Sequence, residues 1–309
     1  MTNIWMDESP SIFVNSSDCI RFEKVSMNYP RRVAIIGAGN VGNKLARLLL
    51  RADFIITGVS SRRLDSARNL ANKIHAPIFT TRPEELIQES DILFLTTPDS
   101  QIESVSRQLA QCAPLQKERY VCHTSGLYTS DLLSAIKNRG AICFSFHPLM
   151  SIIQSESEEK DQPFFVALEG DETGIKCGKY IAKQIGATHF TIPSETKALY
   201  HAGAVIAANY LVTLFSTAVQ VHEAAGIPAE KSERILMPLV LQTVQNIREK
   251  GVRDGLTGPI KRGDAETIRA HLLSFEEKMP ELIDFYKILG KQTLPLVPDF
   301  QSMLQTLFT

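Results

Sequence analysis

The segment that most constrains the fold is a short apolar run, residues 33–36, that leads directly into the glycine pattern Gly37-x-Gly39-x-x-Gly42. Residues 43–52 then have the pattern of a helix, so the order is strand, tight turn and helix. In such a turn the first glycine permits the bend, the second lets a pyrophosphate approach the backbone, and the third lets the helix pack closely. The segment predicts a dinucleotide-binding βαβ unit. An ordinary glycine turn with an empty site is the alternative.

The chain around this turn alternates strand and helix patterns over residues 32–146, which is typical of a parallel sheet with helices on both faces. Two further strands with a helix between them are expected to extend the same sheet. The expected strands are 33–36, 54–59, 77–79, 91–95, 119–123, 141–146, 164–168 and 188–192. The expected helices of this part are 41–52, 62–74, 83–88, 100–111, 128–139 and 173–186.

From Pro193 onward the strand patterns stop and long helical patterns follow, at 194–225, 228–250, 262–274 and 278–290. The fold class is therefore α/β: a Rossmann-type, mostly parallel sheet followed by an all-helical C-terminal domain. The predicted domains are an N-terminal extension over 1–30, a dinucleotide-binding Rossmann domain over 31–192 and a helical domain over 193–309.

The composition excludes several classes of function. A net charge of −1 argues against a nucleic-acid or membrane-surface partner. The five cysteines are dispersed without a C-x-x-C pair, which indicates free thiols in a reducing compartment, and no cysteine and histidine cluster has zinc spacing. Residues 1–18 lack the apolar core of a signal peptide. We therefore expect a cytoplasmic protein without a bound metal.

Residues 202–219 are almost entirely apolar, a property that membrane spans share with the central helices of large cores. Polar residues such as Asn209 and Thr213 interrupt the run, no basic segment flanks it, and it is the only candidate of its kind in the sequence. A buried core helix is therefore the preferred interpretation.

The end of the second expected strand indicates which dinucleotide binds. NAD sites usually place an acid there for the ribose 2′-hydroxyl, whereas this chain has Ser60, Ser61, Arg62 and Arg63. Hydroxyl donors and a planar guanidinium suit a 2′-phosphate. The pattern favours NADP(H) over NAD(H), with two solvated arginines at a helix start as the alternative.

Polar turns follow the next strands, and ligands of open parallel sheets bind beyond the carboxyl ends of the strands. Thr97 and Pro98 follow the fourth strand and Ser125 follows the fifth, so they are expected near the nicotinamide. His147 follows the sixth and is a candidate for substrate binding, whereas His123 fits a structural role equally well. The expected cofactor-binding residues are Gly37, Gly39, Asn40, Val41, Gly42, Ser60, Ser61, Arg62, Thr97, Pro98 and Ser125.

The long helical pattern begins with Lys197, and His201 lies four residues later on the same helix face. Partial burial beside the apolar run would lower the pKa of Lys197 and suit it to donate a proton near neutral pH. A surface lysine whose stem lies along apolar residues is the alternative.

With these features the chain resembles the superfamily of β-hydroxyacid dehydrogenases, ketopantoate reductases and pyrroline-5-carboxylate reductases. More narrowly, it resembles a family of NADP oxidoreductases with a Rossmann-like first domain and a poorly characterised helical second domain. The resemblance covers about residues 31–290. It depends on the glycine turn, His147-Pro148-Leu149, the Lys197-Ala-Leu-Tyr-His-Ala motif, and Leu256-Thr-Gly-Pro-Ile-Lys-Arg-Gly-Asp264.

The resemblance implies that Lys197 is the general acid for the substrate carbonyl. The residue four positions later, often asparagine in the superfamily, is His201 here, which leaves its role open; we expect His201 and Asn209 to orient the substrate. The resemblance also implies a homodimer with the long helix at the subunit interface, which would cover its apolar surface.

The last motif offers a site for an anion. Thr257, Gly258 and Pro259 precede an expected helix, and free backbone N–H groups there could bind a substrate carboxylate. Arg262 could add a bidentate contact and Asp264 could cap the following helix. A purely structural turn with an Arg–Asp ion pair is the alternative.

The expected function is NADPH-dependent reduction of a small 2-oxo acid, with ketopantoate, in pantothenate biosynthesis, as the first choice of substrate. A pyrroline-5-carboxylate-type imine reductase is the second hypothesis. A sensor or scaffold that binds NADP(H) without turnover is the third.

Overall fold

The computed structural model describes residues 31–111, 118–152 and 163–309. The chain divides between Ser194 and Glu195 into two compact units, each treated by itself below. The predicted extension over 1–30, Cys19, Cys112 and most of the polar stretch 151–162 lie outside the described residues. The domain boundary expected at 192/193 stays a prediction.

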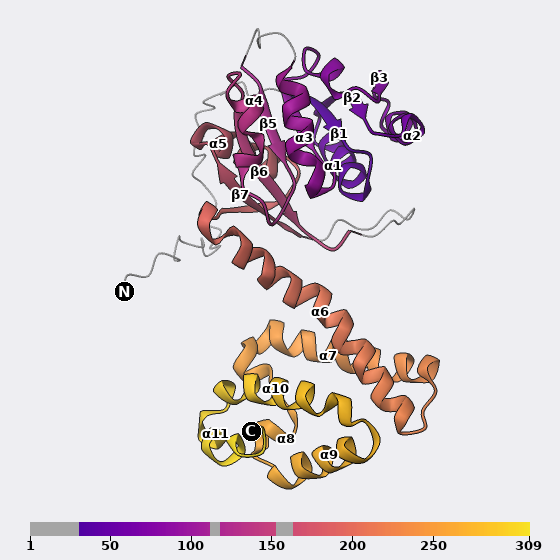
Figure 1. Cartoon of the computed structure of the whole chain (residues 1–309), viewed down its shortest axis with the longest axis vertical. Coiled ribbons are helices and arrows are strands. Elements are labelled where there is room, and N and C mark those ends of the chain that lie inside the picture. The colour runs from indigo at the N-terminus through magenta and orange to yellow at the C-terminus, as the bar shows by residue number, and fades with distance from the viewer. Residues whose placement is uncertain (1–30, 112–117, 153–162) are drawn as a thin grey trace, which may run out of the picture. The chain divides into compact units, whose positions relative to one another are not determined.

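The first unit is built on an eight-stranded sheet with the order β3-β2-β1-β4-β5-β6-β7-β8 (Figure 1). All neighbouring strands are parallel except β6 and β7, which are antiparallel. The mostly parallel Rossmann-type sheet expected from the sequence is confirmed. Its strands are β1 (Arg32–Ile36), β2 (Ile55–Ser60), β3 (Ile78–Thr80), β4 (Ile92–Leu95), β5 (Tyr120–His123), β6 (Ile142–Leu149), β7 (Phe165–Gly170) and β8 (Thr188–Thr191).

Helices cover both faces of this sheet because its central strands are apolar on both sides. One core contains buried side chains of α1 (Asn40–Arg51), α2 (Leu64–Ile74) and α5 (Glu172–Gln184). The core on the other face contains buried side chains of α3 (Asp99–Ala110) and α4 (Ser134–Lys137). The helices α1, α2, α3 and α5 are amphipathic, so burial of the apolar stripe of each one holds it on the sheet.

The second unit is helical, as expected. Its helices are α6 (Lys197–Ala224), α7 (Ala229–Gly255), α8 (Gly258–Arg262), α9 (Ala265–Lys278), α10 (Ile283–Thr293) and α11 (Pro298–Gln305). A small core of Ile268, Leu294, Leu304 and Phe308 joins the last helices. Gly251 interrupts α7 with φ 78°, which explains why the sequence pattern of this helix stops at residue 250.

The expectation of a buried core helix over 202–219 is wrong for the single chain. Within α6 only Lys197 and Val219 are buried. The segment Ser194–Ala224 is long and apolar enough to cross a membrane by length and composition, with 6% of its most apolar window buried. One such helix is weak evidence for a membrane span, because a helix that packs against another subunit passes the same test. The apolar residues that suggested a core instead form an exposed surface.

Candidate functional site

The glycine turn follows β1, where each glycine of the motif has a distinct environment. Gly37 has φ 120°, and a Cβ there would lie 2.6 Å from the backbone of Thr96. A Cβ on Gly42 would lie 2.0 Å from the carbonyl oxygen of Gly37, so this residue lets α1 pack against the turn. A Cβ on Gly39 would meet nothing within 4 Å. The turn is therefore tight at its first and third glycines and open at its second, where a phosphate would approach.

The helix α1 begins at this opening, directly after Gly39. Gly39 is the N-cap residue and supplies no side chain to bond them, which leaves Asn40, Val41 and Gly42 with N–H groups available to an anion. The Asn43 side chain donates hydrogen bonds to the carbonyls of Ala38 and Gly39, at 3.3 and 3.2 Å, and stiffens the turn.

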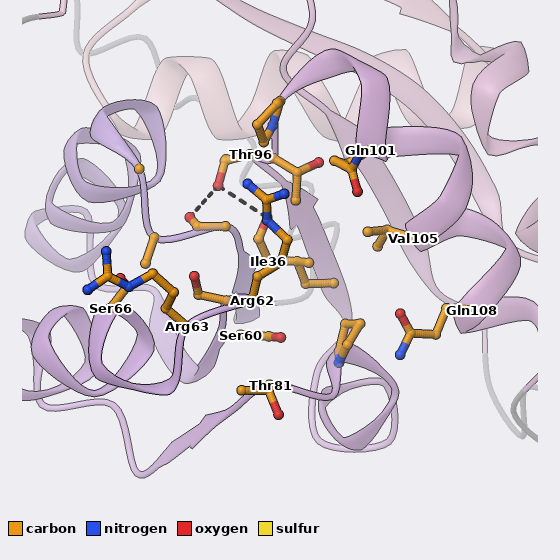
Figure 2. Close-up of a pocket in the computed structure, with 17 residues that line it drawn as sticks. Ile36, Ser60, Arg62, Arg63, Ser66, Thr81, Thr96, Gln101, Val105 and Gln108 are labelled. Atoms are coloured by element: carbon orange, nitrogen blue, oxygen red, sulfur yellow. Dashed lines mark hydrogen bonds between the residues drawn. The ribbon is translucent and has the colours of Figure 1, made fainter.

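Thr96 at the end of β4 connects two of the strands that frame the opening. Its hydroxyl donates to the carbonyl oxygens of Gly37 at 2.7 Å and Ile36 at 3.3 Å (Figure 2). Its backbone N–H also donates to the carbonyl oxygen of Ile36, at 2.8 Å. The N–H of Gly37 donates in turn to the carbonyl oxygen of Ser60. The ends of β1, β2 and β4 are thus locked together at the point where the strand order reverses, which is where open α/β sheets bind ligands.

A pocket of about 330 Å³ lies at this edge of the sheet. Figure 2 shows its walls: Gln101, Val105 and Gln108 follow one helix on one side, and Arg63 and Ser66 lie on the other. The residues that line it are Ile36, Gly37, Ala38, Gly39, Ser60, Ser61, Arg62, Arg63, Ser66, Thr81, Pro83, Thr96, Thr97, Pro98, Gln101, Val105 and Gln108.

The end of β2 forms the polar wall of the pocket. Ser60 is buried, while Arg62 and Arg63 are exposed and precede α2 directly. The nearest acid along the chain, Asp65, pairs with Arg68 at 3.6 Å and does not line the pocket. This wall therefore offers hydroxyl and guanidinium donors without a carboxylate, as a 2′-phosphate requires.

Several lining residues were not predicted from the sequence. Ser66 on α2 and Thr81 after β3 add hydroxyls beside the two arginines. Gln101 and Gln108 come from α3, and the Gln108 amide donates to Glu84 at 2.8 Å. The Thr96–Thr97–Pro98 turn was a visible signal for Thr96. Ser66, Gln101 and Gln108 reach the pocket because α2 and α3 pack against the sheet, and Thr81 reaches it because it follows β3.

The residues of this pocket fit NADP(H). Gly39 leaves open space for a pyrophosphate, and the β2 end has donors for a 2′-phosphate. The buried hydroxyl of Thr97 has no hydrogen-bond partner among the described residues. Because Thr97 lines the pocket, a group of the bound ligand could supply the missing hydrogen bond. Among those same residues, no group of histidine, cysteine or acidic side chains could hold a metal ion.

Ser125 does not line the pocket, although it was expected to bind the cofactor. Its hydroxyl donates to Asp99 at 2.8 Å and accepts from the N–H groups of Leu127 and Tyr128, which uses its whole hydrogen-bonding capacity. The buried His123 accepts from the Ser125 N–H and contacts the carbonyl oxygen of Thr129 at 3.0 Å. These bonds favour the structural role for His123. A cofactor-binding role for Ser125 stays a prediction.

His147 lies within β6 rather than in a turn after it. The parallel pairing of β6 with β5 ends at Ser145, and β6 continues to Leu149 by pairing antiparallel with β7, opposite Ala167 at His147. His147 is half-buried and lies two residues beyond the last parallel pair, on the side of the sheet where the parallel strands end. A role for His147 in substrate binding stays a prediction.

The three expected catalytic residues all lie on α6, but at different positions along it. Lys197 is the first residue of the helix and is 1% exposed, which excludes a solvated surface lysine. His201 follows one turn later and is half-buried. Asn209 is exposed and lies about 18 Å from Lys197 along the helix axis. Lys197 and Asn209 are therefore too far apart on one chain to hold the same small substrate.

The motif around Thr257, Gly258, Pro259 and Arg262 includes the five-residue helix α8. The Asp264 carboxylate accepts from the Thr267 N–H at 3.0 Å and the Thr267 hydroxyl at 2.7 Å, so it caps α9 as expected. These two bonds hold the pKa of Asp264 below its usual value. The Arg262 guanidinium lies 3.9 Å from Asp264 and is mostly exposed. This long ion pair fits the structural alternative and leaves the guanidinium accessible.

Two family models match the chain, one in each half of the sequence. A model of a Rossmann-like domain matches residues 22–148, and a model of a domain of unknown function, DUF2520, matches residues 164–293. A search of curated proteins found no match. The DUF2520 match begins before β7, so this domain family contributes the last strands of the sheet as well as helices.

Solved structures match along nearly their whole length. A protein from Thermotoga maritima is 27% identical with a TM-score of 0.69, covering 86% of this chain and 98% of that one. A "putative NADP oxidoreductase" from Bacteroides fragilis is 23% identical with a TM-score of 0.63, covering 85% and 97%. A 1-pyrroline-5-carboxylate reductase from Streptococcus pyogenes is 16% identical with a TM-score of 0.57, covering 88% and 98%. The chain thus has a segment that matches a Rossmann-like domain followed by a segment that matches DUF2520, and it shares its overall fold with these three solved structures.

Proposed function

We propose that this protein is a cytoplasmic, NADPH-dependent reductase of a small 2-oxo acid, with ketopantoate as the first substrate to test. The observation that carries the proposal is the pocket at the ends of β1, β2 and β4. It joins an open glycine at a helix N-terminus to a wall of hydroxyl and guanidinium donors that contains no acid. Such a pocket suits a phosphorylated dinucleotide.

The chemistry divides between the cofactor and the chain. Bound NADPH supplies the hydride that reduces the carbonyl carbon of the substrate. Lys197 donates a proton from its Nζ atom to the carbonyl oxygen, so that a 2-hydroxy acid results. His201, one turn along the same helix face, orients the substrate, and His147 is a second candidate for contact with it.

A substrate carboxylate needs a cationic or N–H-rich partner. We propose that Thr257, Gly258 and Pro259 supply backbone contacts and that Arg262 supplies a guanidinium. The 64% exposed side chain of Arg262 and its long 3.9 Å separation from Asp264 support this role, because the guanidinium keeps donors for a ligand.

The protein is further proposed to be a homodimer through α6 and α7. Exposed apolar side chains are concentrated on these two helices, among them Ile206, Tyr210 and Val212 on α6 and Leu239, Leu241 and Val244 on α7. Large exposed apolar side chains in this number on two neighbouring helices are unusual for a soluble monomer and are typical of a subunit interface. Asn209 lies within this surface and would then face the partner copy.

The test of function is oxidation of NADPH with ketopantoate, followed for the wild type and for Lys197→Ala. Wild-type turnover that falls by a factor of roughly 100 or more in the variant, with NADPH binding retained, is the expected result. A folded, NADPH-binding wild type that does not reduce ketopantoate would contradict the substrate. Unchanged turnover in Lys197→Ala would contradict the mechanism.

A pyrroline-5-carboxylate-type imine reductase is the second candidate, favoured by the likeness of the fold to a 1-pyrroline-5-carboxylate reductase. A protonated imine is already activated, so its reduction depends less on a proton from Lys197. Turnover of cyclic imines that survives in Lys197→Ala, without turnover of 2-oxo acids, would select this candidate.

A further inference from the structure

A buried carboxylate, Glu169, lies at the end of β7 and has no place in the chemistry proposed above. Its side chain is 2% exposed. Burying a carboxylate costs several kcal/mol unless hydrogen bonds compensate it, so a buried glutamate needs donors around it. Glu169 has them from two segments that are distant from β7 in the sequence.

Both segments donate to the same oxygen atom. The Ser130 hydroxyl donates to Glu169 Oε1 at 2.9 Å, and the Ser194 hydroxyl donates to Oε1 at 3.0 Å. The Ser130 backbone N–H donates to Oε2 at 2.9 Å. Hydrogen bonds to a charged acceptor are stronger than neutral ones, so this cluster holds the two serines firmly on β7.

The two serines lead into different elements. Ser130 begins the 3₁₀ turn Ser130–Leu133 on the face of the sheet. Ser194 begins the 3₁₀ turn Ser194–Thr196, after which Lys197 is the first residue of α6. The carboxylate of Glu169 therefore fixes the chain three residues before the proposed proton donor.

We propose that Glu169 is a positioning residue for Lys197: its carboxylate holds the Ser194 hydroxyl and so fixes the segment that leads into the first residue of α6. This inference rests on the proposed role of Lys197 as the general acid. Proton transfer requires donor and acceptor within hydrogen-bond reach, and a displacement of about 1 Å can cost roughly 100-fold in rate. We expect the Ser194 bond to act on kcat through this geometry and not on NADPH binding, because neither Ser194 nor Glu169 lines the pocket proposed for NADPH.

The experiment compares Ser194→Ala with the matched control Ser130→Ala. Each variant removes one hydroxyl donor from the same oxygen of Glu169, but only Ser194 leads to α6. Ser194 is exposed as a residue, so its variant should fold. We expect kcat to fall by about 10-fold or more in Ser194→Ala, with the Kd for NADPH unchanged, and to stay within about twofold in Ser130→Ala. Ser194→Thr, which keeps the hydroxyl, should restore most of the rate.

Hydrogen exchange supplies a readout that does not depend on activity. The peptide containing residues 194–200 should exchange faster in Ser194→Ala and in Glu169→Gln than in the wild type or Ser130→Ala. Equal kcat values for the two alanine variants, or unchanged exchange at 194–200, would overturn the inference. If the wild type reduces none of the test substrates, the proposed function fails, and the exchange measurement alone decides whether Glu169 anchors the start of α6.

Discussion

At the scale of single residues, the choice of cofactor depends on what stands after β2. A carboxylate there would repel a 2′-phosphate, whereas the guanidinium of Arg62 attracts it and presents paired donors. Ser61 and Ser66 line the same part of the pocket and add hydroxyl donors. The preference for NADPH is therefore expected to depend on Arg62 far more than on any residue that contacts the rest of the dinucleotide.

Replacing Arg62 with alanine tests this expectation. Loss of a hydrogen bond to a charged group costs about 1.5–3 kcal/mol, so the Kd for NADPH should rise roughly 10- to 100-fold. The Kd for NADH, which lacks the 2′-phosphate, should stay the same; fluorescence titration measures both. Arg68→Ala is the matched control, because Arg68 stacks over Phe79 and pairs with Asp65 outside the pocket. Equal loss of affinity for both dinucleotides would contradict the assignment.

Two alanine substitutions in the glycine turn should have different effects: Gly42→Ala on the stability of the fold, and Gly39→Ala on NADPH binding. In Gly42→Ala the new Cβ would lie 2.0 Å from the Gly37 carbonyl oxygen, so α1 must shift, and stability should fall by about 1–3 kcal/mol. In Gly39→Ala the new Cβ meets open space at an ordinary φ of −81°, so stability should change by less than about 1 kcal/mol.

The methyl group of Gly39→Ala would instead occupy the space that a pyrophosphate needs, and the Kd for NADPH should rise at least about tenfold, or 1.4 kcal/mol. Thermal unfolding and NADPH titration of both variants check the pair. A Gly39→Ala protein that binds NADPH like the wild type would show that the pyrophosphate does not pass this residue.

At the scale of elements, the sequence allowed the strands of the sheet to be predicted to within a few residues, since buried strands are apolar runs between turns. The sequence did not show that β7 runs antiparallel to β6, because an apolar run has the same pattern in a parallel and in an antiparallel strand. A signal did exist: no helical pattern separates 141–146 from 164–168, and a parallel connection normally needs a crossover helix. Helix α11 was missed because Pro298 opens it within a short, mixed segment.

The site was predictable where one segment carries the chemistry, as in the glycine turn and the Ser60–Arg63 region. It was not predictable where packing brings distant segments together. Gln101 and Gln108 reach the pocket only because α3 packs on the sheet, and the Glu169 cluster joins three segments that have no common motif. The expected buried helix failed for a related reason: apolar composition does not distinguish a core from a surface that a second chain covers.

The cap of α9 offers a pH-dependent test at this scale. Hydrogen bonds from the Thr267 hydroxyl and N–H lower the pKa of Asp264. The folded state therefore favours the charged carboxylate, so the stability that it adds is fully present above the unfolded pKa and is lost as pH falls through the lower folded pKa.

We expect the Tm of Asp264→Ala to lie below that of the wild type at neutral pH, with the gap closing under acidic conditions as the carboxylate protonates. Asp264→Asn keeps an oxygen acceptor without a titrating group, so it should retain part of the cap at every pH. Circular dichroism melts across the acidic range compare the three proteins. If the difference in Tm between the wild type and Asp264→Ala does not change with pH, the effect does not come from the charge of this carboxylate.

At the scale of the whole molecule, the exposed apolar surface of α6 and α7 must be reconciled with an otherwise ordinary composition. Val212 is 70% exposed and Leu241 is 61% exposed. The composition itself is typical of a globular protein, with 44% hydrophobic residues and a net charge of −1. A surface of this kind would promote aggregation if left open. A second copy of the chain would cover it symmetrically, because an isologous interface buries the same surface on both subunits.

Sedimentation of the purified protein in buffer without detergent tests the dimer. The wild type is expected at twice the monomer mass, and Val212→Asp, which would bury a charge at the interface, at the monomer mass. Leu273→Asp on α9 is the control: this leucine is 64% exposed but lies outside α6 and α7, so the variant should remain dimeric. A monomeric wild type would contradict the dimer. Recovery of the wild type only with detergent would instead favour insertion of α6 into a membrane, which Val212→Asp should then abolish.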